Sequence, residues 1–285
     1  MDQAFKKELR EFIQRALHED VKDGDHTSLA SLPEDKLGEA KLLVKDKGVI
    51  AGVEVGIEIF NYVDSSLQVE VFIHDGDTVS DGDVVLFVRG KMHSILKAER
   101  LVLNVMQRMS GIASRTATFI SALEGTHTRV LDTRKTTPLL RFLEKKAVTI
   151  GGGTNHRFGL YDMILIKDNH VDYAGGIIQA VENAQAYKVK HNLDIPIEVE
   201  VRNFTELNEL LSCKAVDRVM FDNFTPTAVK EAVALVNGRL VTEASGGITL
   251  ETIRDYAVAG VDFISVGALT HSVRSLDLSL KAKLI

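Results

Sequence analysis

Apolar residues follow two different rhythms along the first hundred positions. Residues 1–20 carry apolar side chains at helical spacing on one side, which predicts an amphipathic helix. Residues 67–96 instead alternate apolar and polar positions and break at Asp-Gly pairs, a pattern typical of β-hairpins. Residues 40–52 indicate two further strands around a turn at 46–48. The apolar side of the first helix consists of Phe5, Leu9, Phe12, Ile13 and Leu17.

A long helical pattern over residues 98–123 then connects two regions that differ in their apolar patterning. Its buried side would contain Leu103 and Met106, and Gly111 predicts a break in it. After residue 128 the pattern changes to apolar strands that alternate with helices, which predicts a parallel sheet, either open or closed as a barrel. The expected strands cover residues 129–133, 162–166, 195–201, 218–222, 239–244 and 262–267.

The expected helices between these strands carry recognisable end signals. Asn203 with Glu206 resembles a capping box, and Thr225 followed by Pro226 is typical of a helix start. Gly238 and Gly260 occupy positions where left-handed residues end helices.

Composition narrows the class of protein. The 285 residues are enough for one large and one small domain, and 45% apolar content supports a substantial core. A net charge of −6 argues against nucleic acid or an anionic membrane surface as partner. No apolar run approaches the length of a spanning helix, and the start of the chain has no signal-peptide pattern. One cysteine, Cys213, excludes an intrachain disulfide, so a cytoplasmic location is expected.

Cationic residues gather after the first two strands of the second region. Arg134 and Lys135 follow the first strand, Lys167 follows the second, and His156 and Arg157 lie in the glycine-rich stretch between them. In a parallel barrel such strand ends meet at one face. Any one of these side chains could be a solvated loop cation or an ion-pair partner. Five together, inside an acidic protein, predict a site for a polyanionic ligand.

Two later loops indicate a phosphate site. Ser245, Gly246 and Gly247 precede a helix expected from Thr249, so backbone amides and the helix dipole would face a bound anion. Gly267 follows the next strand and could close the site from the other side. The last two strands of a barrel are a common phosphate position.

Two carboxylates end neighbouring strands and could bind a hard cation. Glu200 and Asp222 suit magnesium, which uses one or two protein carboxylates together with substrate phosphates. Ion pairing with the nearby cations explains both residues equally well. The nine histidines show no zinc-ligand spacing.

The ordered set of loop motifs resembles the quinolinate phosphoribosyltransferase family. The match runs from the first helix to the end of the chain without a departure at a functional position. The motifs that carry it are Glu99-Arg100, residues 107–113, residues 133–138, Gly151-Gly152-Gly153 with His156-Arg157, residues 165–170, residues 221–223 and residues 245–248.

The resemblance implies an α/β fold with an N-terminal α/β sandwich domain and an incomplete α/β barrel of about seven strands. The domains would cover residues 1–115, with 273–285 returning to the first, and residues 116–272. The family's activity is phosphoribosyl transfer from phosphoribosyl pyrophosphate to quinolinate with decarboxylation, giving nicotinate mononucleotide in NAD biosynthesis. Magnesium would assist, and no organic cofactor is expected.

The resemblance also implies residue roles and a homodimer with a shared active site. Quinolinate's two carboxylates would contact Arg134, His156, Arg157, Lys167 and the partner's copy of Arg100. The roles at the other substrate are a catalytic Lys135 near the ribose and pyrophosphate, catalytic and metal-binding Glu200 and Asp222, and a 5′-phosphate site of Ser245, Gly246, Gly247 and Gly267, with Ser272 as a further candidate.

Three alternatives stay open at this point. A phosphoribosyltransferase for nicotinate or another pyridine acid would need no decarboxylation. A Schiff-base barrel aldolase would use Lys135 or Lys167 as nucleophile. The glycine-punctuated hairpins of residues 67–96 also resemble biotinyl or lipoyl carrier domains, although no lysine occurs there before Lys91, so this segment is interpreted as scaffold.

Overall fold

The computed structural model describes residues 1–283, which form two compact units. The first unit contains residues 1–117, residues 142–152 and the chain from residue 273 onward; the second contains residues 118–141 and 153–272. Residues 142–152, expected in the barrel, belong to the first unit. Aromatic packing accounts for this placement. The Phe142 ring packs edge-on against Phe5 and Phe12, and its centroid lies 5.3 Å from that of Phe5 and 5.9 Å from that of Phe12.

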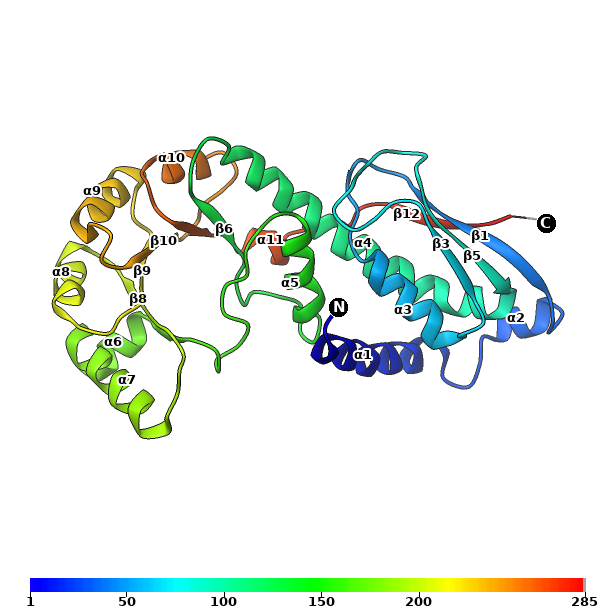
Figure 1. Cartoon of the computed structure of the whole chain (residues 1–285), viewed down its shortest axis with the longest axis horizontal. Coiled ribbons are helices and arrows are strands. Elements are labelled where there is room, and N and C mark those ends of the chain that lie inside the picture. Colours follow the sequence, from blue (N-terminus) through cyan, green and yellow to red (C-terminus); the bar gives the residue numbers. More distant parts are fainter. Residues whose placement is uncertain (284–285) are drawn as a thin grey trace. The chain divides into compact units, whose positions relative to one another are not determined.

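The first unit is built on a four-stranded antiparallel sheet with the order β12-β1-β5-β3 (Figure 1). The chain's last strand therefore pairs with its first one, as the returning C-terminal segment was expected to do. The elements of this unit are α1 (Gln3–Val21), α2 (His26–Ser31), β1 (Leu37–Val44), β2 (Gly48–Val49), α3 (Val53–Val63), β3 (Gln68–Val71), β4 (Thr78–Val79), β5 (Val84–Lys91), most of α4 (Met92–Ala122), α5 (Arg141–Ile150) and β12 (Leu278–Lys283).

The two strands expected within residues 40–52 do not pair with each other. β1 already has β5 and β12 on its two sides, so β2 pairs with β4 in a separate two-stranded ribbon. Residues 67–96 supply β3 and β5, two neighbours in the main sheet, which agrees with their interpretation as scaffold.

The break predicted at Gly111 was wrong, because α4 continues from Met92 to Ala122. A Cβ at Gly111 would lie 2.3 Å from the carbonyl oxygen of Arg274. The glycine therefore serves the close approach of the C-terminal segment to the helix rather than its end. Among the helices of residues 1–283, none combines the length and apolar character needed to cross a bilayer.

The second unit confirms the α/β class and the strand–helix alternation. Its parallel sheet has the order β6-β11-β10-β9-β8-β7, and Thr154 adds a single parallel bridge to Leu131 of β6. The six strands and the bridge at Thr154 are arranged around a barrel, which stays open between Thr154 and β7. The strands are β6 (Arg129–Leu131), β7 (Ile164–Ile166), β8 (Ile197–Val201), β9 (Arg218–Asp222), β10 (Val241–Ser245) and β11 (Phe263–Ser265).

Helices lie outside these strands (Figure 1). The predicted N-caps are confirmed: the Asn203 side chain accepts the Glu206 N–H at 3.0 Å, and Thr225 accepts the Ala228 N–H at 3.3 Å. Gly238 and Gly260 adopt the expected left-handed conformation. The helices are α6 (Asp168–Ala174), α7 (Ile177–His191), α8 (Phe204–Ser212), α9 (Pro226–Val236), α10 (Ile253–Val258) and α11 (Ala268–His271).

Candidate active site

One cavity in the second unit collects all five cationic residues predicted from the sequence. Its volume is about 340 Å³, and it lies where strands β6, β7, β10 and β11 end. The cationic lining residues are Arg134, Lys135, His156, Arg157 and Lys167; the others are Thr133, Leu165, Met220, Glu243, Ser245 and Ser265.

The charges in this cavity act on one another. Burial lowers the pKa of Arg157, and the nearby guanidinium of Arg134 lowers it further. Like charges therefore lie close together in the cavity and repel each other. An anionic ligand would relieve this repulsion.

The loop that carries Lys135 is fixed at both ends by hydroxyl groups. The Lys135 N–H donates to Thr133 Oγ1 at 3.1 Å, and the buried Thr270 hydroxyl donates to the Lys135 carbonyl oxygen at 2.7 Å. Gly267 leaves room here, because a Cβ on it would lie 3.2 Å from Cδ of Lys135. The backbone of Lys135 is thereby placed while its side chain stays exposed.

Backbone contacts hold the segment that carries His156 and Arg157. The His156 N–H donates to Oδ1 of the buried Asp132 at 2.9 Å. The Arg157 N–H donates to Nδ1 of the His156 ring at 2.7 Å. The imidazole thus contacts the backbone of the neighbouring cavity residue.

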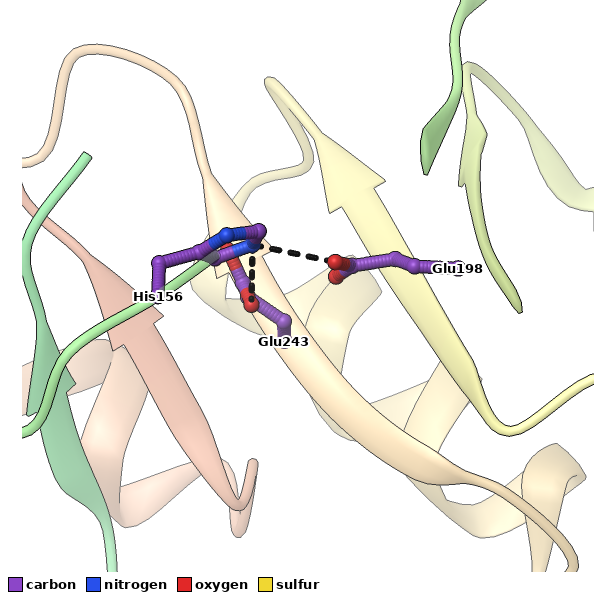
Figure 2. Close-up of side chains that lie close together, drawn as sticks. All are labelled: His156, Glu198 and Glu243. Atoms are coloured by element: carbon purple, nitrogen blue, oxygen red, sulfur yellow. Dashed lines mark ion pairs between the residues drawn. The ribbon is translucent and has the colours of Figure 1, made fainter. Parts of the chain in front are cut away.

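His156 contacts two glutamates that are fully buried, and one of them, Glu243, also lines the cavity. Figure 2 shows the imidazole reaching between Glu198 on β8 and Glu243 on β10. Nε2 of His156 lies 3.0 Å from Glu198 Oε2 and 3.5 Å from Glu243 Oε2. Arg218 on β9 completes the cluster, with Nη1 3.0 Å from Glu243 Oε2 and its guanidinium 4.7 Å from the ring centre of Phe263.

The sequence predicted no role for Glu198 or Glu243. The signal was present in strand β8, where Ile-Glu-Val-Glu-Val alternates yet all five residues are buried. Alternation in a strand with both faces covered means that the glutamates face the barrel interior. They therefore need internal partners.

The cluster keeps a proton that its separate groups would release near neutral pH. Burial lowers the pKa of His156, but Glu198 and Glu243 raise it to about 9. Burial and the charge of Glu243 raise the pKa of Glu198 to about 7. The pKa of Glu243 is lowered: its burial acts upward, but contacts with His156 and Arg218 outweigh it.

The location of that proton follows from the contact at Nδ1. A cationic imidazole would carry a hydrogen on Nδ1, which conflicts with the Arg157 N–H pointing at the same atom from 2.7 Å. We assign the neutral ring with its hydrogen on Nε2, and the additional proton to Glu198. The ring nitrogen that faces the glutamates then has no lone pair for a metal ion, although the three side chains lie close enough to surround one.

The two carboxylates predicted as magnesium ligands differ in their surroundings. Glu200 Oε2 lies 2.8 Å from Nζ of Lys167, so the ion-pair alternative holds for this residue. Asp222 is half-buried and accepts a hydrogen bond from Nδ2 of Asn223 at 2.7 Å. Asp222 fits a hard cation as a single carboxylate at a strand end. Glu200 fits one only if Lys167 releases it.

The two loops predicted to bind phosphate follow β10 and β11, but the helix after the first loop starts later than predicted. α10 begins at Ile253 rather than near Thr249, because residues 249–252 form a turn in which Thr252 Oγ1 accepts the Thr249 N–H at 3.0 Å. The dipole argument therefore does not hold for this loop. Gly246 and Gly247 both have positive φ angles, 101° and 61°, which turn the chain sharply after β10.

Gly246 has a further steric reason. A Cβ there would lie 2.2 Å from Oδ1 of Asn223 and 2.9 Å from its backbone nitrogen. Ser245 itself lines the cavity, whereas Ser272 contacts the His271 ring, with Oγ 2.6 Å from Nδ1. Arg100 is exposed on α4 in the first unit.

Fold and site together define an α/β barrel protein with a cavity lined by cationic residues at the carboxyl ends of its strands. The description "Quinolinate phosphoribosyl transferase, N-terminal domain" applies to a family model that matches residues 25–110, and the corresponding C-terminal domain matches residues 112–281. The chain belongs to the quinolinate phosphoribosyltransferase family.

Curated relatives and solved structures agree with this assignment. The chain is 46% identical to the chloroplastic nicotinate-nucleotide pyrophosphorylase [carboxylating] of Arabidopsis thaliana, covering 96% of this chain and 82% of the relative. It is 41% identical to the probable nicotinate-nucleotide pyrophosphorylase [carboxylating] of Bacillus subtilis, covering 97% and 94%. The crystal structure of NadC from Streptococcus pyogenes superimposes with a TM-score of 0.92 at 38% identity, covering 96% of each chain.

Proposed function

We infer that this protein transfers the phosphoribosyl group of phosphoribosyl pyrophosphate to quinolinate, with loss of CO2, to give nicotinate mononucleotide and pyrophosphate. The observation that carries this inference is the single cavity lined by Arg134, Lys135, Arg157 and Lys167. Two of its relatives carry the name of the reverse direction, nicotinate-nucleotide pyrophosphorylase [carboxylating], at 41% and 46% identity along nearly the whole chain. The reaction belongs to NAD biosynthesis.

Both substrates are anions, so the cavity must first overcome their mutual repulsion. Arg134 and Arg157 can each hold a carboxylate through two parallel N–H donors, and Lys167 adds a compact positive charge. Two carboxylates on neighbouring ring atoms account for this number of cations better than the one carboxylate of nicotinate. We therefore assign quinolinate to these three residues.

Binding orients the pyridine nitrogen toward the anomeric carbon of the ribose. Holding two reactants in line can supply several kcal/mol of the barrier. Lys135 stabilises the charge that develops on departing pyrophosphate, and a carboxylate at a strand end, Asp222 or Glu200, stabilises the cationic ribosyl centre. Magnesium, when bound with the pyrophosphate at Asp222, would add further charge neutralisation.

Decarboxylation then needs no nucleophile from the protein. Attack by nitrogen makes the pyridine ring positive. The C2–carboxylate bond breaks, CO2 leaves, and the electron pair stays on C2 beside that positive nitrogen, much as in a thiamine ylid. A proton from solvent then forms the C2–H bond of nicotinate mononucleotide. A Schiff-base aldolase would need a desolvated lysine, whereas Lys135 is exposed and Lys167 is ion-paired with Glu200.

The direct test is incubation with quinolinate, phosphoribosyl pyrophosphate and magnesium, with nicotinate as the control substrate. We expect release of CO2 and formation of nicotinate mononucleotide from quinolinate, and negligible product from nicotinate. Turnover of nicotinate at a similar rate would assign the chain to the alternative transferase. Activity unaffected by a chelator would contradict the role of magnesium.

A homodimer with a shared active site is part of this proposal. The exposed Arg100 would reach the cavity of the partner subunit. Arg100→Ala and Lys135→Ala should each be inactive, and mixing the two variants should restore part of the activity because one intact site forms per mixed dimer. Silence in mixed dimers verified by tagged purification would contradict the shared site. The cytoplasmic location expected from the sequence stays a prediction.

A further inference from the structure

The two glutamates that contact His156 are unusual occupants of a barrel interior. Such interiors are filled by branched apolar residues, yet Glu198 and Glu243 are both 0% exposed. Their strands are separated by β9, and both side chains converge on the same imidazole (Figure 2). Glu198 Oε1 makes no hydrogen bond within the described residues. Buried carboxylates of this kind cost stability, so a gain in stability does not explain them.

The contacts of His156 connect these glutamates to the cavity. Its Nε2 contacts Glu198 and Glu243, while its Nδ1 accepts the backbone N–H of Arg157 at 2.7 Å. Nδ1 thus accepts a hydrogen bond, while Nε2 lies at ion-pair distance from the two carboxylates. The contacts lead to Arg157, which lines the cavity.

The same geometry limits what His156 itself can do for a ligand. Its Nδ1 already accepts the Arg157 N–H, and its Nε2 faces Glu198 and Glu243. Part of its effect on binding therefore passes through Arg157, whose backbone it holds. Displacing a binding group by as little as 1 Å can lower a rate by about 100-fold, so fixing one backbone amide matters.

We propose that Glu198 and Glu243 are positioning residues that act through His156 to hold Arg157 in the cavity. For the identity of the ligand, this inference rests on the proposed function. Arg218 keeps Glu243 in place from the neighbouring strand, with Nη1 3.0 Å from Oε2. The role is distinct from direct contact with quinolinate.

The test compares alanine and glutamine at each glutamate. Glu198→Ala and Glu243→Ala should raise KM for quinolinate about tenfold and leave KM for phosphoribosyl pyrophosphate within about twofold. Glu198→Gln and Glu243→Gln keep an oxygen acceptor near Nε2 and should recover most of the loss. Equal rises in both KM values, or no difference between alanine and glutamine, would overturn the proposal.

A coupling test follows the link through the imidazole. His156→Asn keeps an acceptor near the position of Nδ1 but cannot reach the glutamates. In that background, Glu198→Ala should add less than twofold to KM for quinolinate, because the connection is already cut. Full additivity of the two substitutions would contradict action through His156.

Two further measurements separate the proposed role from general destabilisation and test the protonation of His156 in the unsubstituted protein. Glu144→Gln is the matched control, because Glu144 is equally buried and pairs with Arg108 at 2.8 Å in the first unit; it should lower the melting temperature without a selective KM effect.

In the unsubstituted protein, ¹⁵N NMR of histidine should show an unprotonated Nδ1 for His156, assigned with His156→Gln. A protonated Nδ1 would overturn the link to Arg157. If the parent releases no CO2 from quinolinate, the proposed function fails, whereas an active parent with unaffected variants refutes only this inference.

Discussion

The central strands of the two units bury different kinds of side chain. In the first unit, strands β1 and β5 face the core with Leu42, Val44, Leu86 and Val88, all 0% exposed. In the second unit, strands β8 and β10 bring Glu198 and Glu243 to the same level of burial. These positions are closed to water in both units. The first unit buries charge elsewhere, at Glu39, Glu144 and Lys145, whereas the second unit buries charge inside the barrel itself.

This difference separates stability from function. Burying a leucine side chain stabilises a fold by about 1.5–3 kcal/mol. A buried ion pair contributes little net stability, and apolar replacements of it are often neutral or stabilising. The apolar interior therefore holds its unit together, whereas the charged interior serves the cavity above it.

The largest effect is expected from a core truncation in the first unit. Leu86→Ala should lower the free energy of unfolding by about 3 kcal/mol, because it opens a cavity between strands β1 and β3 where Leu86 pairs with Leu42 and Val71. Urea unfolding followed by circular dichroism measures this. The KM for quinolinate should not change, and a selective rise would show that the apolar interior also shapes the cavity.

The next effect is expected in binding rather than in stability. Arg157→Ala and Arg134→Ala should each weaken quinolinate binding about 100-fold, since each removes charge-assisted hydrogen bonds in a half-buried cavity. Calorimetry should show phosphoribosyl pyrophosphate binding largely intact. The control is Arg202→Ala, which removes an exposed arginine paired with Asp172 and Glu206 and should leave both affinities unchanged. Equal losses for both ligands would refute the carboxylate assignment.

The charged interior should also make stability depend on pH. The pKa of Glu198 is raised to about 7, so the folded state holds a proton that the unfolded chain releases. A raised value stabilises the fold at low pH, and this contribution is lost as pH rises through about 7. The free energy of unfolding should drop by on the order of 1 kcal/mol between pH 6 and pH 9.

Glu198→Gln provides the control for this pH dependence. Glutamine does not titrate, so the part of the slope near pH 7 should disappear in the variant. Urea midpoints at closely spaced pH values measure both proteins. A parent protein that becomes more stable toward pH 9 would contradict the sign derived from the cluster.

The sequence predicted the polar ends of the second unit better than its interior. Arg134, Lys135 and Lys167 directly follow strands, and strand ends meet at one face of a parallel barrel, so their convergence follows from order alone. The contacts of Glu198 and Glu243 depend on which residues face each other across three strands. That register is set by the closed structure, and sequence periodicity does not specify it.

The glycines also differ in whether local sequence or a distant contact determines their role. Gly238 and Gly260 follow helices and have the predicted left-handed conformation, because local chain geometry decides their role. Gly111 was wrong as a helix break, because its role is set by a backbone more than 150 positions away at Arg274. Local signals could be predicted, and contacts between distant segments could not.

The smallest expected effect tests whether stability and binding are separate within the second unit itself. Thr225 caps α9 by accepting the Ala228 N–H at 3.3 Å, outside the barrel interior. Thr225→Ala should lower the free energy of unfolding by about 1 kcal/mol, because one N–H of the first turn loses its acceptor. The KM for quinolinate and its pH dependence should match those of the parent. Thr225→Ser retains the hydroxyl and should restore the stability. If Thr225→Ala raised KM for quinolinate as much as Glu198→Ala does, any weakening of this unit would disturb the cavity, and the special role of the charged interior would be lost.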